Sequence, residues 1–174
     1  MRKKEKTAWM EILPKHGQDR QDKRDNKREG DKLLAVIFIL KMRDDIWLKE
    51  KLENIWGLLF PEVIRENNIN VKFRGRGKCR FGCIKLKGKD SAIEINSLFK
   101  NELVPEYVID TTLAHELVHY VHGFSSPLPK KYRHPHKGGV VDKELIKRGF
   151  GDSLKLEKVW AKKDWEKVFG LIKT

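Results

Sequence analysis

The chain has 174 residues, 36% of them charged, and a formal net charge of +13. This length suits one domain with a sizeable core. No stretch approaches the roughly 18 apolar residues that a membrane span requires. The two cysteines are too few for a disulfide framework or a zinc ribbon. We therefore expect a cytoplasmic protein without membrane contacts.

The positive charge is unevenly distributed along the chain. Residues 71–90 carry a net charge of +7 and residues 127–174 carry +7, while residues 91–126 between them carry −4. Basic surfaces attract polyanions, and basic residues interleaved with Phe73 and Phe81 suit single-stranded nucleic acid. The alternative is a charged edge strand that resists aggregation. The candidate nucleic-acid contacts are Arg74, Arg76, Lys78 and Arg80.

The N-terminal third divides by composition. Residues 1–13 can form a short amphipathic helix, whereas residues 15–32 have no apolar side chain and are expected to form a flexible linker or a solvated helix. The apolar run 33–40 fits a helix or a strand. A helix is predicted from about 44 to 60, because apolar residues recur there at steps of three and four. These residues are Trp47, Leu48, Leu52, Ile55, Trp56 and Leu59.

Three short strands are predicted next. Residues 69–74 alternate between apolar and polar side chains, and residues 79–86 and 91–95 are the second and third strands. The segment 87–90 between the last two has the composition of a turn. We expect the strand at 79–86 to form an edge of the sheet.

The remaining elements are mainly helical. Pro105 is suited to begin a helix that runs to about His122, and Gly123 is suited to end it. A proline-rich loop follows, then a helix over 138–148, and residues 153–172 are expected to form a helix that docks on the core. This order predicts an α+β fold. The predicted divisions are an N-terminal extension (1–32), a central domain (33–150) and a C-terminal helical extension (151–174).

One segment of the predicted helix, His115-Glu116-Leu117-Val118-His119, carries the chemistry. Histidines four residues apart project from the same helix face and can bind one zinc ion. Glu116 lies about 100° around the helix from His115, where it can reach a water bound to that ion. Such a glutamate acts as the general base of metallopeptidases. The prediction is a zinc site with Glu116 as the catalytic residue.

A catalytic zinc usually has three protein ligands. His122 lies about 10.5 Å along the helix axis from His115, too far for both to bind one ion. The extended metzincin pattern also fails, because it requires Gly at 122 and His at 125. His136 is favoured as the third ligand, because it directly precedes a predicted helix start. The other candidates are His134, Asp142 and Glu144.

Residues 45–150 resemble the SprT-like zinc peptidases, the family that contains Spartan. The resemblance lies in the tryptophan-containing helix, the short hairpin, Ala92–Leu98, Thr111–Tyr120 and a later stretch around His136. It implies a small zincin-like domain in which a short antiparallel sheet packs on the HExxH helix. It also implies zinc bound by three histidines, Glu116 as base, and a catalytic core without the family's C-terminal zinc ribbon. The three implied ligands are His115, His119 and His136.

Two functions follow from these expectations. The first is a zinc endopeptidase that acts on proteins associated with nucleic acid, as family members do. The second is a nucleic-acid-binding protein whose zinc site is structural, with Cys79 or Cys83 as a fourth ligand, or latent, with residues 1–32 or a cysteine covering the open zinc position. An intact Glu116 favours the first, because a structural site has no use for it.

Overall fold

The computed structural model describes Arg28 and residues 42–173. The expectations for residues 1–13, 15–32 and 33–40 therefore lie outside the described residues, apart from Arg28, and so does the latency hypothesis for residues 1–32. The chain divides into two units after Lys41, and the second unit contains the whole region from Met42 onward.

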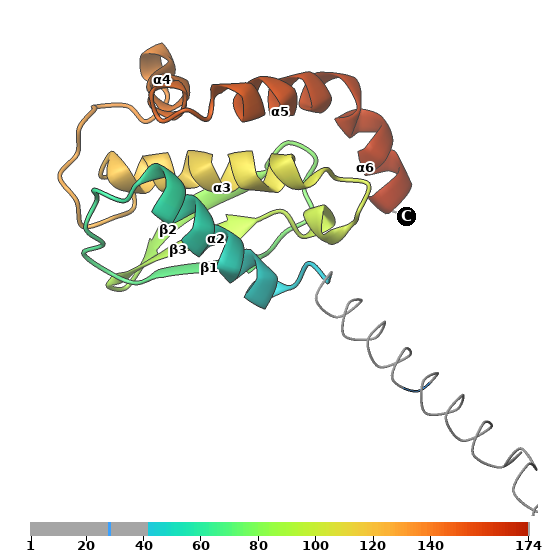
Figure 1. Cartoon of the computed structure of the whole chain (residues 1–174), viewed down its shortest axis with the longest axis horizontal. Coiled ribbons are helices and arrows are strands. Elements are labelled where there is room, and N and C mark those ends of the chain that lie inside the picture. Colours follow the sequence, from blue (N-terminus) through green and yellow to red (C-terminus); the bar gives the residue numbers. More distant parts are fainter. Residues whose placement is uncertain (1–27, 29–41, 174) are drawn as a thin grey trace, which may run out of the picture. The chain divides into compact units, whose positions relative to one another are not determined.

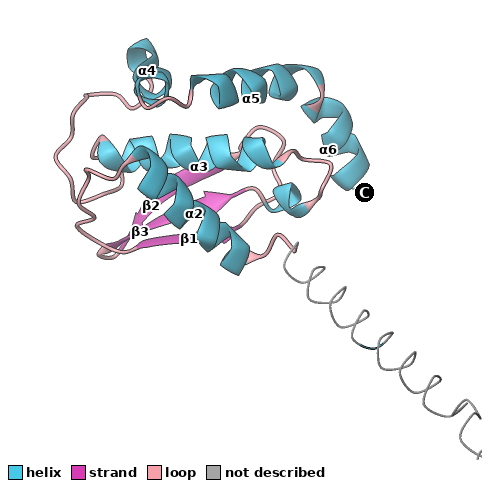
Figure 2. Cartoon of the chain, viewed as in Figure 1, coloured by secondary structure: helices cyan, strands magenta, loops and turns pink. Residues whose placement is uncertain are grey.

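The second unit is a mixed α+β fold with a three-stranded sheet (Figures 1 and 2). Five α-helices lie among the described residues from Met42 onward, and none of them is long and apolar enough to cross a membrane. The elements in chain order are α2 (Asp45–Leu59), β1 (Ile69–Phe73), β2 (Gly82–Lys87), β3 (Asp90–Ile95), η1 (Ser97–Lys100), α3 (Glu106–Val121), η2 (Lys137–Gly139), α4 (Val140–Lys147), α5 (Gly151–Lys163) and α6 (Trp165–Lys173).

Most predicted elements are confirmed within a few residues. Helix α2 begins after Asp44, whose carboxylate accepts a hydrogen bond from the Trp47 N–H and caps the helix. Two boundaries were wrong. The second strand begins at Gly82 rather than at 79, because Cys79 to Phe81 belong to the connection from β1. The C-terminal region is two helices rather than one, since α5 ends at Lys163.

The sheet order is β1-β3-β2, and the expectation of a purely antiparallel sheet was wrong. Strands β2 and β3 form the predicted hairpin and pair antiparallel, but β1 pairs parallel to β3. The connection from β1 crosses past β3 before β2 begins, so β3 becomes the central strand. The predicted edge is confirmed, because no strand among the described residues pairs with the outer side of β2.

The helices α2 and α3 lie on one side of the sheet. Helix α2 packs on β1, and α3 packs on β2 and β3. Helix α3 lies between the sheet and α5, so it is covered on two sides (Figure 1). This position explains why most of its side chains are buried, including Leu113, Leu117 and Tyr120, which are fully enclosed. Burial of that apolar surface is the main source of stability for the site helix.

The other sheet face carries charged side chains, and no helix within residues 42–173 covers it. Lys72, Lys85 and Lys87 are exposed there, and Glu94 of the central strand is buried among the basic side chains. Its carboxylate lies 2.8 Å from the Lys85 ammonium and 3.2 Å from the Arg74 guanidinium. We call this surface, with Lys72, Arg74, Lys85, Lys87 and Glu94, the open sheet face.

Candidate metal centre and cleft

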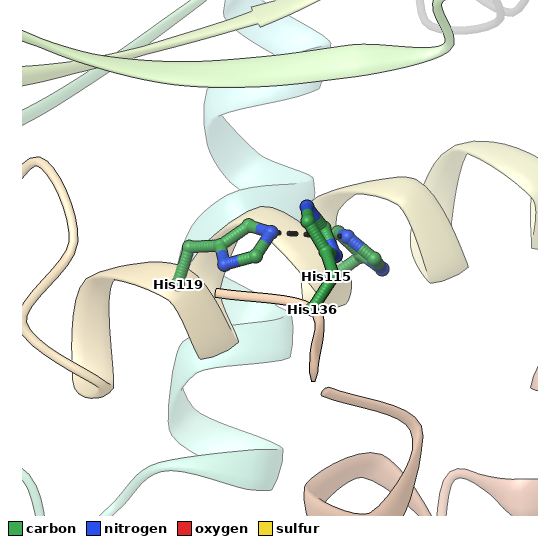
Figure 3. A group of neighbouring side chains, drawn as sticks. All are labelled: His115, His119 and His136. Atoms are coloured by element: carbon green, nitrogen blue, oxygen red, sulfur yellow. Dashed lines mark hydrogen bonds between the residues drawn. The ribbon is translucent and has the colours of Figure 1, made fainter. Parts of the chain in front are cut away.

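Three histidines converge beside the edge strand. His115 and His119 come from successive turns of α3, and His136 comes from the end of the following loop (Figure 3). One ligand nitrogen from each lies within 4.8 Å of the others, and the Nε2 atoms of His115 and His119 are 3.1 Å apart. The structure thus brings together the three histidines favoured from the sequence.

The electrostatic environment keeps two of these histidines neutral. Burial, and then the neighbouring His136, lowers the pKa of His115 to about 4. Burial, with His115 next, lowers the pKa of His119 to about 3. Neutral imidazoles are the form that binds metals. His119 Nδ1 is also buried without a hydrogen-bond partner among the described residues. The donor set therefore fits a borderline-soft divalent ion such as zinc.

The remaining ligand candidates lie elsewhere. His122 is 1% exposed, its ring packs against Tyr132, and its Nε2 is 3.9 Å from Glu144. This position agrees with the helix geometry, which excluded His122 as a ligand of the ion that His115 would bind. His134 is exposed and outside the histidine group. Asp142 is paired with Lys158, and Glu144 is paired with Arg148.

Neither cysteine belongs to the histidine group. Cys83 Sγ lies 3.9 Å from Glu94 Oε2. That carboxylate belongs to the open sheet face, so this thiol points away from α3. Cys79 is exposed in the connection before β2. Within residues 42–173 the three histidines have no fourth protein ligand in their group. The structural-zinc hypothesis required a fourth protein ligand, for instance one of these cysteines, and neither cysteine has that position in the described residues.

Glu116 is buried between α3 and β2, and 6% of it is exposed. Burial raises the pKa of its carboxyl to about 7, while the Ile84 N–H and the Arg80 guanidinium oppose the shift. Gly82 makes this position possible. A β-carbon on Gly82 would lie 2.7 Å from Thr112 Cγ2 and 3.1 Å from Glu116 Oε1.

Two hollows meet at His115 and Glu116. One, of about 510 Å³, extends toward His119, Phe124 and His136. The other, of about 420 Å³, extends toward Thr111 and the side chains of α5. Thr111 is about one helical turn before His115 and His119 is one turn after it, so the hollows extend in opposite directions along α3. Together they form a cleft whose wall is the start of β2.

The loop after α3 is fixed to the edge strand. Gly123 ends the helix with φ +78°, where glycine is favoured, and a β-carbon there would lie 2.5 Å from the Pro129 carbonyl oxygen. Ser125 Oγ donates to the Ile84 carbonyl at 3.3 Å, and Ser91 Oγ donates to the Ser125 carbonyl at 2.7 Å. These contacts position the loop that brings His136 back to α3.

The four basic residues predicted to bind nucleic acid do not form one strip. Arg74 lies on the open sheet face, Arg76 donates to the Ile172 carbonyl, and Lys78 pairs with Glu166 of α6. Arg80 lines the hollow beside Glu116. Arg74 and Arg80 share a third hollow of about 280 Å³.

The aromatic residues that favoured single-stranded nucleic acid pack into the core. Phe73 is 8% exposed, and Phe81 contacts Phe99, Trp160 and Trp165. Phe73 is enclosed and Phe81 reaches only the hollows beside it, so the two rings form no exposed row for stacking, and the stacking basis for a single-strand preference is lost.

Two site residues were not identified from the sequence. A glycine inside a predicted strand often marks a close approach of the backbone to another group, so Gly82 carried a usable signal. Glu157 of α5 lines the hollow toward Thr111, and its sequence neighbourhood gives no comparable signal.

Comparison with protein-family models, curated proteins and solved structures finds no match for this chain. The candidate function therefore rests on the chain's own geometry.

Proposed function

We propose that this protein is a zinc-dependent endopeptidase of the SprT-like type. The observation that supports it most is the convergence of three histidines beside a buried glutamate at an open cleft. The ligands would be His115, His119 and His136. Three protein ligands are typical of catalytic zinc sites, whereas structural sites use four. A zinc ion held there supplies Lewis acidity, which polarises a carbonyl and makes water nucleophilic near neutral pH.

Glu116 has the position of the proton carrier. It lines both hollows next to His115, so its carboxylate faces the place where a substrate carbonyl and a water would meet. It accepts the proton of the attacking water and delivers it to the leaving amine. Burial favours this role, because it raises the pKa of the carboxyl and so helps it to retain the proton taken from water.

The edge strand is suited to bind the substrate backbone. Gly82, Cys83 and Ile84 line the hollow that contains the three histidines. Among the described strands β2 pairs only with β3. The outer N–H and carbonyl of Ile84 are bonded to Glu116 and Ser125, so an extended peptide would pair with the start of β2 at Gly82. Such binding would place a peptide bond beside Glu116 through backbone contacts.

The experiment follows cleavage of an unfolded protein substrate by the purified full chain. We expect cleavage that stops with 1,10-phenanthroline and returns when stoichiometric zinc is restored, with new N-termini identified by mass spectrometry. Cleavage that persists in a protein stripped of zinc would contradict the proposal.

The open sheet face supports a second activity, binding to the phosphodiester backbone of nucleic acid. Lys72, Arg74, Lys85 and Lys87 surround one carboxylate, so the face keeps an excess of positive charge. Backbone recognition of this kind is sequence-independent and strongly salt-dependent. It would bring the peptidase to proteins that are bound to nucleic acid.

This activity is tested with the triple variant Lys72→Gln, Lys85→Gln, Lys87→Gln. We expect its affinity for duplex and single-stranded DNA, measured by fluorescence anisotropy, to fall at least about tenfold, and the salt slope to drop by about two to three. The matched control removes three exposed lysines elsewhere, Lys49, Lys143 and Lys155. Equal losses in the two triple variants would show that only net charge matters and would remove this face as the binding site.

A further inference from the structure

The hollow toward α5 has two apolar walls and a charged far side. Phe81 and Leu154 supply apolar surface, and Gly82, His115 and Glu116 connect it to the candidate metal centre. A side chain that enters this hollow therefore belongs to a substrate residue next to the bond being cleaved. The volume of about 420 Å³ is sufficient for a long side chain.

At the α5 end of this hollow, one acidic group has no ion-pair partner within the described part of the chain. The carboxylate of Asp142 is paired with the Lys158 ammonium, so their charges largely cancel. The carboxylate of Glu157, which also lines the hollow, has no hydrogen bond or ion pair with any residue from 42 to 173. Burial raises the pKa of Glu157, the charge of Lys158 opposes the shift, and Asp142 adds to it.

Arg80 is the other charge in the hollow, and its influence is on Glu116. Arg80 is two residues before Gly82, which contacts Glu116, so its positive charge belongs to the catalytic end of the hollow. Asp142 and Lys158 form a pair, so the excess charge at the α5 end is the negative one on Glu157. A ligand that spans the hollow would present apolar groups to Phe81 and Leu154 and a positive charge to Glu157.

We propose that this hollow is a specificity pocket and that Glu157 selects a lysine or arginine side chain adjacent to the scissile bond. The inference rests on the proposed peptidase function and names the substrate residue that this function prefers. The aliphatic stem of a lysine or arginine covers the apolar walls while its charged end reaches the carboxylate. A neutral side chain of the same length leaves Glu157 without a cation.

The test compares peptides that are identical except for lysine, glutamine or glutamate at the varied position. Wild type should cleave the lysine peptide with a kcat/KM at least about tenfold above that of the glutamine peptide. Glu157→Gln should reduce this ratio to near one, and Glu157→Lys should favour the glutamate peptide. The control is Glu102→Gln, an exposed position outside the cleft, with zinc content measured in every variant.

The outcomes separate the pocket from the chemistry. If wild type cleaves none of the peptides or unfolded proteins, the peptidase function itself is wrong. If wild type cleaves them but Glu157→Gln slows all peptides equally, Glu157 has only a structural role and the specificity proposal is overturned. A wild-type preference for glutamate would also overturn it and would indicate Arg80 as the selecting group.

Discussion

Gly82 and Glu116 contact each other so closely that position 82 has no room for a side chain. A β-carbon there would lie 3.1 Å from the Glu116 carboxylate and 2.7 Å from Thr112 Cγ2. The edge strand and the site helix thus fix each other's position through a glycine. This contact determines where the carboxylate lies relative to the histidines.

Replacing Gly82 with alanine is therefore expected to displace Glu116 while leaving the histidines in place. A displacement of about 1 Å in a catalytic group can reduce the rate about 100-fold, so kcat/KM should fall by roughly ten- to a hundredfold. Zinc content should stay at the wild-type level. The control is Gly77→Ala, where a β-carbon would have nothing within 4 Å. Full activity in Gly82→Ala would show that this packing is unimportant.

The identity of the third ligand is tested by zinc affinity. His136→Ala should lose at least about 100-fold in affinity, because it removes a ligand outright, whereas outer-shell changes already cost roughly ten- to a hundredfold. His134→Ala should retain wild-type affinity, since His134 is exposed and outside the histidine group. Chelator competition measures both. The opposite ranking would assign the ligand to His134.

The local features of this site could be predicted from the sequence, but few of its long-range contacts could. The HExxH spacing, the helix and the hairpin follow from periodicity and turn chemistry, so His115, Glu116 and His119 could be placed on one helix. The parallel pairing of β1 with β3 could not be predicted, because register between distant segments depends on the whole core. The same applies to Glu157, which reaches the cleft only because α5 packs on α3.

The surface on which the basic residues lie was harder to predict from the sequence than the helix that carries the histidines. The basic stretch 71–90 is evident in the sequence, but it is divided between the open sheet face, α6 and the cleft. Phe73 and Phe81 alternate with basic residues, and this pattern fits a nucleic-acid surface and a core-facing strand equally well. For Phe81, packing against Trp160 and Trp165 decides for the core.

Glu94 predicts how stability depends on pH. The Lys85 ammonium, supported by Lys87 and Arg74 and opposed by burial, lowers the pKa of Glu94 to about 2. Because this pKa is lower in the folded state than the unfolded value of 4.5, ionised Glu94 stabilises the fold fully above about pH 4.5. That stabilisation is lost as the pH falls toward 2. Because its partners are about half exposed, we expect a contribution of about 1 kcal/mol.

The measurement is urea denaturation of wild type and Glu94→Gln between about pH 7 and pH 2.5. The difference in free energy of unfolding should be largest at neutral pH and should shrink below about pH 4.5. A difference that does not change with pH would mean that the charge of Glu94 contributes nothing to stability.

Trp165 anchors α6 and the segment before β2. It is 5% exposed, packs against Phe81, Phe99 and Phe169, and donates from its indole N–H to the Lys78 carbonyl at 2.7 Å. Trp165→Ala should lower the free energy of unfolding by about 3–5 kcal/mol. Val159→Ala, on the exposed side of α5, should change it by less than about 0.5 kcal/mol. Similar values for the two would mean that α6 is not part of the cooperative fold.

The most direct test of the central claim is a comparison of wild type with Glu116→Gln, which keeps the size of the side chain but cannot accept a proton as a carboxylate does. Bound zinc is measured in both proteins, and cleavage of the same unfolded protein is followed in both. We expect equal zinc content and a loss of at least about 100-fold in the cleavage rate of Glu116→Gln. Equal cleavage by the two proteins would contradict the peptidase function assigned to this site.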